Sequence, residues 1–388
     1  MRKISALLPL FLILLLSGCW DQGDISELVI VDMIGIEKDK NTDEFVIYLQ
    51  IVNPTSFATQ EKRIDSSPVY TFVSKHKSLK AAVDKASLQV PRHLFFAKTN
   101  FLLLSSDLEI SDMEEIFNFL DRNSETRAPI QTAVSLQPLS ETMFRLTKIN
   151  ILPGQWLFEN LQASKRHFSA TVLKYRVRDN VEKYYRDGNL LFPAVVFLDD
   201  NAQTTDFLNE VDTSSGHAQF VGGVAYQKNA EPVLLSEEEM ALYNLLKNQL
   251  NQLPLTVSKD EEVAHFLDIN RCKSKKKTIG ENPYRFGFRI TCKADFLNSK
   301  VTDTLTLKAI EEMESEANKS LEAKLSELTD KLQEEELDLL GLFSRYPSMS
   351  KMEKRSAFKN ATLTYDVKIT VNDVGNIIDS YSDEEEQE

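Results

Sequence analysis

Two apolar runs, LVIVDMIGI at residues 28–36 and FVIYLQIV at residues 45–52, decide how the fold begins. Both runs are rich in β-branched residues, which suit the pleated surface of a sheet. The polar sequence KDKNTDE at residues 38–44 lies between them and has the composition of a turn. This pattern predicts two strands joined by a turn, and we expect a sheet to start here.

The residues before this sheet have the features of a signal peptide that ends at a lipid attachment site. Arg2 and Lys3 precede an apolar run of thirteen residues, 4–16, which is shorter than the ~20 residues of a membrane-spanning helix. The ending Leu16-Ser17-Gly18-Cys19 is similar to the bacterial lipobox, in which diacylglycerol is attached to the cysteine. We therefore expect residues 1–18 to be removed and Cys19 to carry the lipid. Its two acyl chains would make a stable anchor. An ordinary secretory signal with an incidental cysteine is the alternative.

The composition is that of a globular protein, with 42% hydrophobic and 27% charged residues. The formal charge of −14 becomes −16 once Arg2 and Lys3 are removed with the signal. This balance argues against a nucleic-acid partner and against a broad electrostatic attraction to anionic lipid. Attachment to a membrane would then depend on the lipid at Cys19.

Hydrophobic spacing along the rest of the chain predicts an irregular mixture of strands and helices, which is typical of the α+β class. The longest helical signal covers residues 305–340. Its apolar stripe favours a helix packed on its own sheet, and coiled-coil pairing is the alternative. Residues 171–187 combine tyrosines with basic residues, which favours a solvated helix face and leaves a binding groove as the alternative. Gly222-Gly223 lacks the other residues of a phosphate loop, so we expect a bulge or a close backbone contact there.

The sequence contains no motif with the spacing of a known catalytic or metal site. The five histidines lie far apart in the sequence and are His76, His93, His167, His217 and His265. Structural or surface roles are therefore favoured for them. We predict no catalytic residue, no metal site and no cofactor, and a cell-envelope hydrolase remains an unsupported alternative.

Two cysteines remain if Cys19 is lipidated, and an exported chain can oxidise such a pair. Cys272 and Cys292 flank residues 274–283, which we expect to connect two strands of a hairpin. Their midpoint is residue 282, so a symmetric antiparallel pairing would place them opposite each other. This arrangement predicts a Cys272–Cys292 disulfide, and two free thiols in neighbouring strands are the alternative.

Several segments, in order along the chain, carry a family resemblance. The mature start Cys19-Trp20-Asp21, the run Pro91-Arg92-His93-Leu94-Phe95-Phe96 and residues 119–127 resemble an N-terminal signature. Val221-Gly222-Gly223, residues 235–239, residues 332–341 and Gly375 resemble a C-terminal signature. Both signatures belong to the C-subunit lipoproteins of bacterial spore nutrient-germinant receptors, the Ger(x)C family.

This resemblance implies an elongated, multi-domain α+β protein with three domains. We expect an N-terminal domain at residues 19–198, a middle domain at 214–258, a C-terminal domain at 259–381 and an acidic tail at 382–388. Residues 199–216 are polar and acidic, and we expect a linker or long loop there.

The resemblance also implies a function without catalysis. The chain would be a subunit of a nutrient-germinant receptor, required for the germination response and anchored through Cys19 to the outer face of the inner spore membrane. Its expected partners are an integral-membrane, transporter-like receptor subunit and a third receptor subunit. The alternative is a solute-binding lipoprotein serving a membrane transporter, which two similar α/β lobes around a hinge would favour.

Overall fold

The computed structural model describes residues 27–53, 67–122, 130–144, 152–167, 176–198, 217–258, 264–299 and 306–373. Their strands form two sheets, and helices pack on both, so the predicted α+β class is confirmed. In chain order the elements are β1 (Leu28–Asp39), β2 (Glu44–Val52), β3 (Val69–His76), α2 (Leu79–Ser87), β4 (His93–Phe95), β5 (Phe101–Ser105), α3 (Ile110–Arg122), β6 (Gln131–Ser135), α4 (Leu139–Thr142), α5 (Pro153–His167), α6 (Val177–Asp187), β7 (Asn189–Leu198), β8 (His217–Gln227), β9 (Val233–Leu235), α7 (Glu237–Leu246), β10 (Gln252–Ser258), β11 (Ala264–Glu281), β12 (Tyr284–Ser299), α8 (Leu307–Glu334), α9 (Lys351–Lys359) and β13 (Thr362–Asp373).

The larger sheet has the strand order β3-β2-β1-β5-β6-β7-β8-β9, and β4 pairs with β1. The predicted hairpin of β1 and β2 is antiparallel. The central strands β1, β5, β6 and β7 run parallel to their neighbours in this group. Because parallel strands need crossover connections, helices cover both faces of the sheet. One face packs against α2, α3 and α6, and the other packs against α4 and α5.

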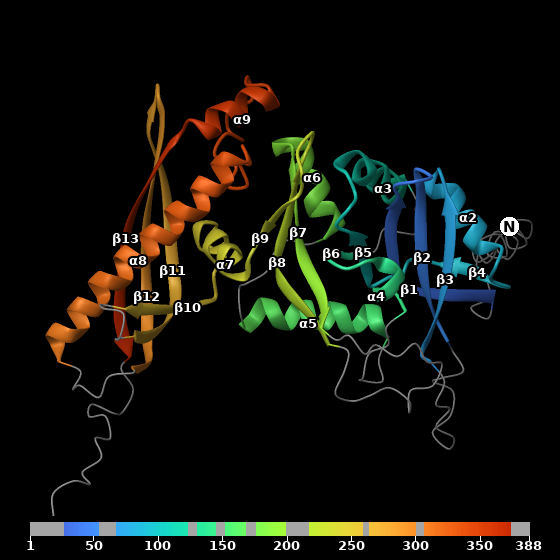
Figure 1. Cartoon of the computed structure of the whole chain (residues 1–388), viewed down its shortest axis with the longest axis horizontal. Helices are drawn as coiled ribbons and strands as arrows, with labels where there is room; N and C mark the ends of the chain where they lie inside the picture. The colour runs from blue at the N-terminus through green and yellow to red at the C-terminus, as the bar shows by residue number, and fades with distance from the viewer. Residues whose placement is uncertain are drawn as a thin grey trace, which may run out of the picture.

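The smaller sheet lies at the other end of an elongated molecule (Figure 1). Its order is β10-β11-β12-β13, and β13 runs parallel to β12 after the crossover through α8. Its core includes residues from α7, α8 and the chain that follows α8. Leu191 of β7 and Ala225 of β8 belong to the same core, so the two sheets share buried contacts.

The strands of residues 217–258 belong to both sheets. Strands β8 and β9 extend the larger sheet, whereas β10 pairs with β11 in the smaller one. Helix α7 lies between them and buries its side chains in the core of the smaller sheet (Figure 1). The division into three domains, with a middle domain at 214–258, stays a prediction from the family resemblance.

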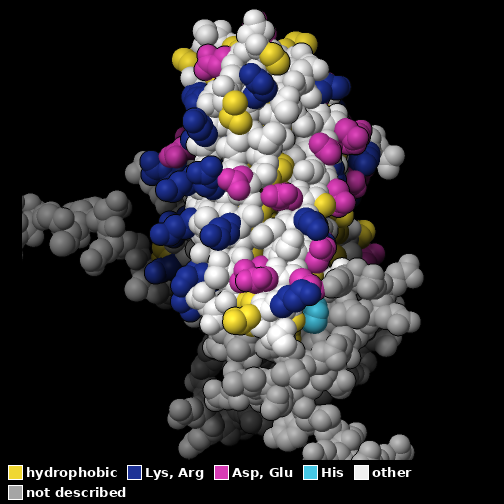
Figure 2. All heavy atoms as spheres, turned by 90° about the vertical axis from the view of Figure 1, so that its left-hand side faces the viewer, with side chains coloured by type: hydrophobic (Ala, Val, Ile, Leu, Met, Phe, Trp, Pro, Cys, Tyr) yellow, Lys and Arg dark blue, Asp and Glu magenta, His cyan; other side chains and the backbone are white. Residues whose placement is uncertain are grey.

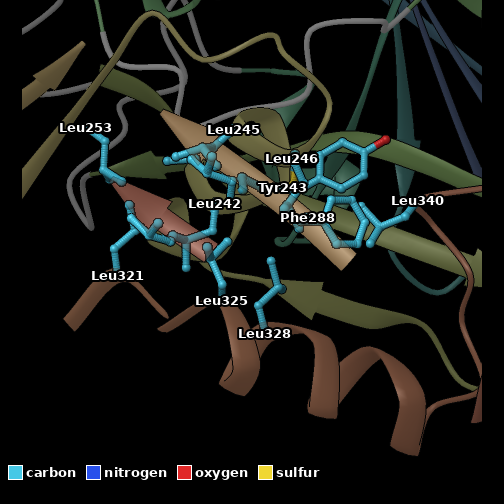
Figure 3. Packing of buried hydrophobic residues seen from close by; sticks show 14 of the residues in the cluster. Leu242, Tyr243, Leu245, Leu246, Leu253, Phe288, Leu321, Leu325, Leu328 and Leu340 are labelled. Atoms are coloured by element: carbon cyan, nitrogen blue, oxygen red, sulfur yellow. The ribbon is translucent and has the colours of Figure 1, made fainter. Parts of the chain in front are cut away.

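Helix α8 packs on its own sheet, as the favoured interpretation of its apolar stripe predicted. Leu321, Leu325 and Leu328 point toward Leu242 and Phe288 in the core (Figure 3). Burial of a leucine side chain contributes about 1.5–3 kcal/mol. The helix is shorter than the predicted 305–340, because it ends at Glu334. Leu337, Leu339 and Leu340 are still buried, but they reach the core from an irregular segment.

Side chains of α8 also cover the edge of the smaller sheet. The backbone N–H groups of Val367, Ile369 and Val371 in β13 donate hydrogen bonds to α8. The acceptors are Glu322 at 3.1 Å, Asn318 at 2.8 Å and Glu314 at 2.8 Å, respectively. The acceptors are four residues apart on the helix, which is a rise of about 6 Å, and the donors are two residues apart on the strand, which is about 6.6 Å. Because these two spacings nearly match, each acceptor on α8 lies opposite one of the N–H groups of β13 that point away from the sheet. The edge strand is thereby closed to pairing with another chain.

Two local expectations fared differently. The stretch 274–283 was expected to connect two strands, but the structure places residues 274–281 within strand β11, so only Asn282 and Pro283 form the turn before β12. Alternating polar and apolar residues pair there as strands in spite of the basic composition. The close backbone contact predicted at Gly222-Gly223 is confirmed, because Gly222 has φ +81° and a Cβ there would lie 2.0 Å from the Leu235 carbonyl oxygen.

We expect Asn318→Ala to lower the free energy of unfolding by about 1–2 kcal/mol, because it leaves the buried Ile369 N–H without an acceptor. Urea unfolding of the mature chain carrying Cys19→Ser measures this change. Hydrogen exchange at the Ile369 amide should accelerate as well. Ser315→Ala, at an exposed position of the same helix, is the matched control. Equal stability of the two variants would contradict the edge-capping role.

Candidate functional site at the junction of the two sheets

The segment that follows α8, residues 335–346, joins the two sheets. Glu336 adopts a left-handed conformation with φ 53°, which ends the helix. The Asp338 carboxylate then accepts hydrogen bonds from the backbone N–H groups of Leu342 at 2.9 Å and Phe343 at 2.8 Å. The side-chain amide of Asn189 in β7 donates to the Asp338 carbonyl oxygen at 3.1 Å. The turn is therefore held by hydrogen bonds within the segment and by one hydrogen bond to the larger sheet.

A second carboxylate binds the same segment from the larger sheet's side. Asp187, at the end of α6, accepts hydrogen bonds from Ser344 at 2.6 Å and from two nitrogens of Arg186, each at 3.0 Å. Burial alone would raise the pKa of Asp187, but these donors hold it below its usual value. Burial does raise the pKa of Asp338, although its two backbone donors oppose that effect. The junction thus holds two buried carboxylates in different electrostatic environments.

A cavity of about 520 Å³ is lined by Asp187 and by residues that follow Asp338 in the same segment. Its walls come from α6, the end of α7, β11 and residues 339–345. Part of the segment 171–187, which we expected to be a solvated helix face, therefore lines a cavity, while Tyr185 on the same helix is exposed. The alternative interpretation of this segment was a binding groove, and among its described residues this cavity is the matching feature. We call it the junction cavity.

The outer face of the smaller sheet is basic, although the chain as a whole is acidic. Register places these side chains on the face opposite the core: Lys273, Lys275, Lys277, Arg285, Arg289, Lys293 and Lys368. Arg289 pairs with Asp366 at 2.7 Å. Figure 2 shows basic side chains gathered along one side of this end of the molecule. The net charge of the chain therefore does not describe this face, which attracts acidic groups locally.

A larger hollow of about 1530 Å³ lies at the opposite end, between α2, α3 and the chain around β4. It is lined by residues of the N-terminal signature, among them Pro91, Phe95 and Phe119. Glu27 and Leu28, where the described chain begins, also line it. We call this hollow the N-terminal groove.

Cys19 lies outside the described residues. Cys272 and Cys292 lie in β11 and β12, and the structure joins them by a disulfide with a Cα–Cα distance of 4.1 Å. Pairs from Lys273↔Thr291 to Thr278↔Phe286 have the register centred on residue 282 that the sequence predicted. A bulge at Arg271, which has φ 47°, shifts the register beyond the cysteines. Cys292 is buried, so the bond faces the core.

The histidines that the structure describes do not come together. The Nδ1 atom of His76 accepts a hydrogen bond from the Ser78 backbone N–H at 3.1 Å. His93 is exposed on β4. His265 packs against Phe296, and burial lowers its pKa. Within the described ranges, no group of three His, Cys, Asp or Glu residues could hold a metal ion, and no helix is long and apolar enough to cross a membrane.

Comparison with known proteins defines the class. Residues 21–196 match the N-terminal domain of spore germination proteins, and residues 234–375 match the C-terminal domain described as spore germination B3/GerAC-like. The two matches together cover most of the chain, and the second begins at β9. The chain therefore belongs to the Ger(x)C family of spore germination proteins.

Two known proteins are similar to this chain. Spore germination protein KC of Bacillus subtilis (strain 168) is 28% identical over 183 residues, which are 46% of this chain and 44% of that protein. The match thus spans less than half of the relative's length. The crystal structure of the GerBC protein resembles this fold with a TM-score of 0.52 and 16% identity, covering 87% of this chain and 96% of that one. This second likeness concerns the fold.

Sequence reasoning missed the charged residues of the junction. Lys183, Lys247 and Lys276 lie far apart in the sequence, yet all three line the junction cavity. The segment 332–341 was noticed as part of a family signature, but its role in joining the sheets depends on contacts with Asn189 and Asp187. The available local signal was Asp338, a single aspartate within the otherwise apolar run of residues 337–342.

We expect Cys272 and Cys292 to be recovered from the exported protein as one disulfide-linked peptide pair in non-reducing mass spectrometry. The linked segment spans 20 residues, and closing it would stabilise the fold by about 3 kcal/mol in the chain-entropy model. Reduction should therefore lower the urea midpoint of the wild type. It should leave the Cys272→Ser/Cys292→Ser variant unchanged. Recovery of both cysteines as separately alkylated thiols would contradict this prediction.

Proposed function

We propose that this chain is a lipid-anchored, non-enzymatic subunit of a spore nutrient-germinant receptor, required for the germination response. Its membership of the Ger(x)C family, with matches in both halves of the chain, carries the proposal. Its partners would be an integral-membrane, transporter-like subunit and a third receptor subunit. Its location would be the outer face of the inner spore membrane.

The anchor would be diacylglycerol on Cys19. Seven residues lie between Cys19 and Glu27, and the eight Cα-to-Cα steps that join the two residues reach at most ~28 Å. A lipid at Cys19 would therefore keep the N-terminal groove close to the bilayer. This placement makes the groove available to a membrane-embedded partner, while the smaller sheet extends away along the long axis of the molecule (Figure 1).

The alternative of a solute-binding lipoprotein finds less support in the fold. Such a protein would be favoured by two similar α/β lobes, but the two described sheets differ in strand number and strand order. They also share a core through Leu191 and Ala225. The arrangement favours one continuous scaffold over two lobes that close on a solute.

We expect spores without this chain to lose the response to one class of nutrient and to germinate normally when receptors are bypassed. The fall in optical density of spore suspensions, with amino acids, sugars and nucleosides as separate nutrients, measures the response. Because a related subunit could substitute, the strain should also lack such relatives, and restoring this chain alone should restore the response. Unchanged germination on every nutrient in that strain would contradict the proposal.

We expect Cys19→Ala to abolish lipid labelling and to release the protein from the membrane fraction, because no thiol remains for the acyl chains. Labelling with a radioactive fatty acid followed by membrane fractionation measures both effects. The Cys272→Ser/Cys292→Ser variant keeps Cys19 and should be labelled like the wild type. Persistent labelling of Cys19→Ala would show that the anchor lies elsewhere.

A further inference from the structure

The junction cavity has the size and wall structure of a small-molecule site. Its volume of about 520 Å³ falls within the ~300–1,000 Å³ of typical ligand pockets. Tyr243 from α7 and Leu340 from the segment after α8 both line the cavity, and both belong to the apolar cluster drawn in Figure 3. Both side chains are largely buried, as is Leu191 from β7. An apolar surface is thus available beside the charged groups of the cavity.

Cations predominate among the charged residues that line this cavity. They are Lys183, Arg186, Lys247, Lys276 and Arg345. The lining carboxylates are Asp179, Glu182 and Asp187. Asp187 is already engaged by Arg186 and Ser344, and Glu182 accepts from Arg178 at 3.2 Å. These carboxylates therefore leave part of the positive charge uncompensated.

Two of the lysines have no hydrogen-bond acceptor among the residues that the structure describes. The Lys183 ammonium lies 6.0 Å from the centre of the Tyr243 ring, a cation–π distance. Lys276 projects from β11 toward the same cavity. By contrast, Lys247 donates to the Leu340 carbonyl oxygen at 3.2 Å, and Arg345 donates to Thr278. Lys183 and Lys276 are thus the cations available to a ligand.

The electrostatic environment of both lysines disfavours their charge in the empty cavity. Burial, together with the nearby charge of Lys247, lowers the pKa of Lys183 to about 8. Burial also lowers the pKa of Lys276, and Arg345 adds to that effect, while Asp338 opposes it. A negatively charged ligand would reverse both effects, since an opposite charge favours the protonated form. Perturbed groups of this kind in a cavity are typical of binding sites.

We propose that the junction cavity binds a small oxyacid anion, either a carboxylate or a phosphate, through Lys183 and Lys276, with the uncharged part of the ligand against Tyr243 and Leu340. Lys183 is carried by α6 of the larger sheet, whereas Lys276 belongs to the smaller sheet. The ligand therefore bridges the two halves of the molecule and strengthens their contact. This site goes beyond the proposed receptor role and does not depend on it.

The test uses the mature chain, residues 19–388, with Cys19→Ser in place of the anchor. Sodium phosphate and sodium acetate are titrated separately by isothermal calorimetry, with sodium chloride at equal ionic strength as the blank. We expect saturable binding of at least one anion. The anion with the higher affinity shows whether the site prefers a phosphate or a carboxylate. NMR of the lysine ε-methylene groups should show the Lys183 pKa rising as the anion is added.

Two variants remove the site, and one serves as a control. Lys183→Gln should weaken binding at least tenfold, and Lys276→Gln provides a second variant at an exposed position that the fold tolerates. Lys85→Gln changes the same charge on α2, outside the cavity, and should bind like the parent chain. Absence of saturable binding by both anions overturns the proposal. Equal weakening by Lys85→Gln also overturns it, because binding would then reflect only the overall charge.

Discussion

The buried carboxylate of Asp338 is the constraint on which the joining of the two sheets depends. It binds the backbone N–H groups of Leu342 and Phe343, and so fixes the turn after α8. The carbonyl oxygen of the same residue is bonded to Asn189 in the larger sheet. Each hydrogen bond satisfies a backbone group of this turn. Leaving such a group buried without a partner would cost about 1–3 kcal/mol. A single residue therefore orders the turn and attaches it to a distant strand.

The distribution of charge gives the two ends of the molecule different surfaces. An acidic chain carries a basic outer face on the smaller sheet, whereas the lining of the N-terminal groove combines apolar side chains such as Phe95 and Phe119 with charged residues of both signs. This segregation arises because alternate residues of β11 and β12 face opposite sides of the sheet. The apolar set, including Phe286 and Phe288 of β12, enters the core, and Lys273, Lys275 and Lys277 of β11 remain in solvent.

In the proposed receptor role, three surfaces of the fold would be available to partners. The N-terminal groove would lie near the membrane, the basic face lies at the far end, and the junction cavity lies between the two sheets. Helix α8 closes the edge strand β13 through Asn318 and its neighbours, which directs association toward these other surfaces. A chain without a described catalytic cluster can still transmit a signal if a ligand or partner changes the contact between its halves.

Sequence alone determined the local features of this protein. Apolar, β-branched runs located β1 and β2, helical spacing of apolar residues located α8, and the midpoint of Cys272 and Cys292 predicted the register of their hairpin. The extension of the larger sheet by β8 and the placement of Lys183 and Lys276 around one cavity were decided by the tertiary structure. Hydrophobic periodicity reports which face of an element is buried, because it arises within one turn or one pleat. It carries no information about which distant element covers that face, and that choice follows from the packing of the whole chain.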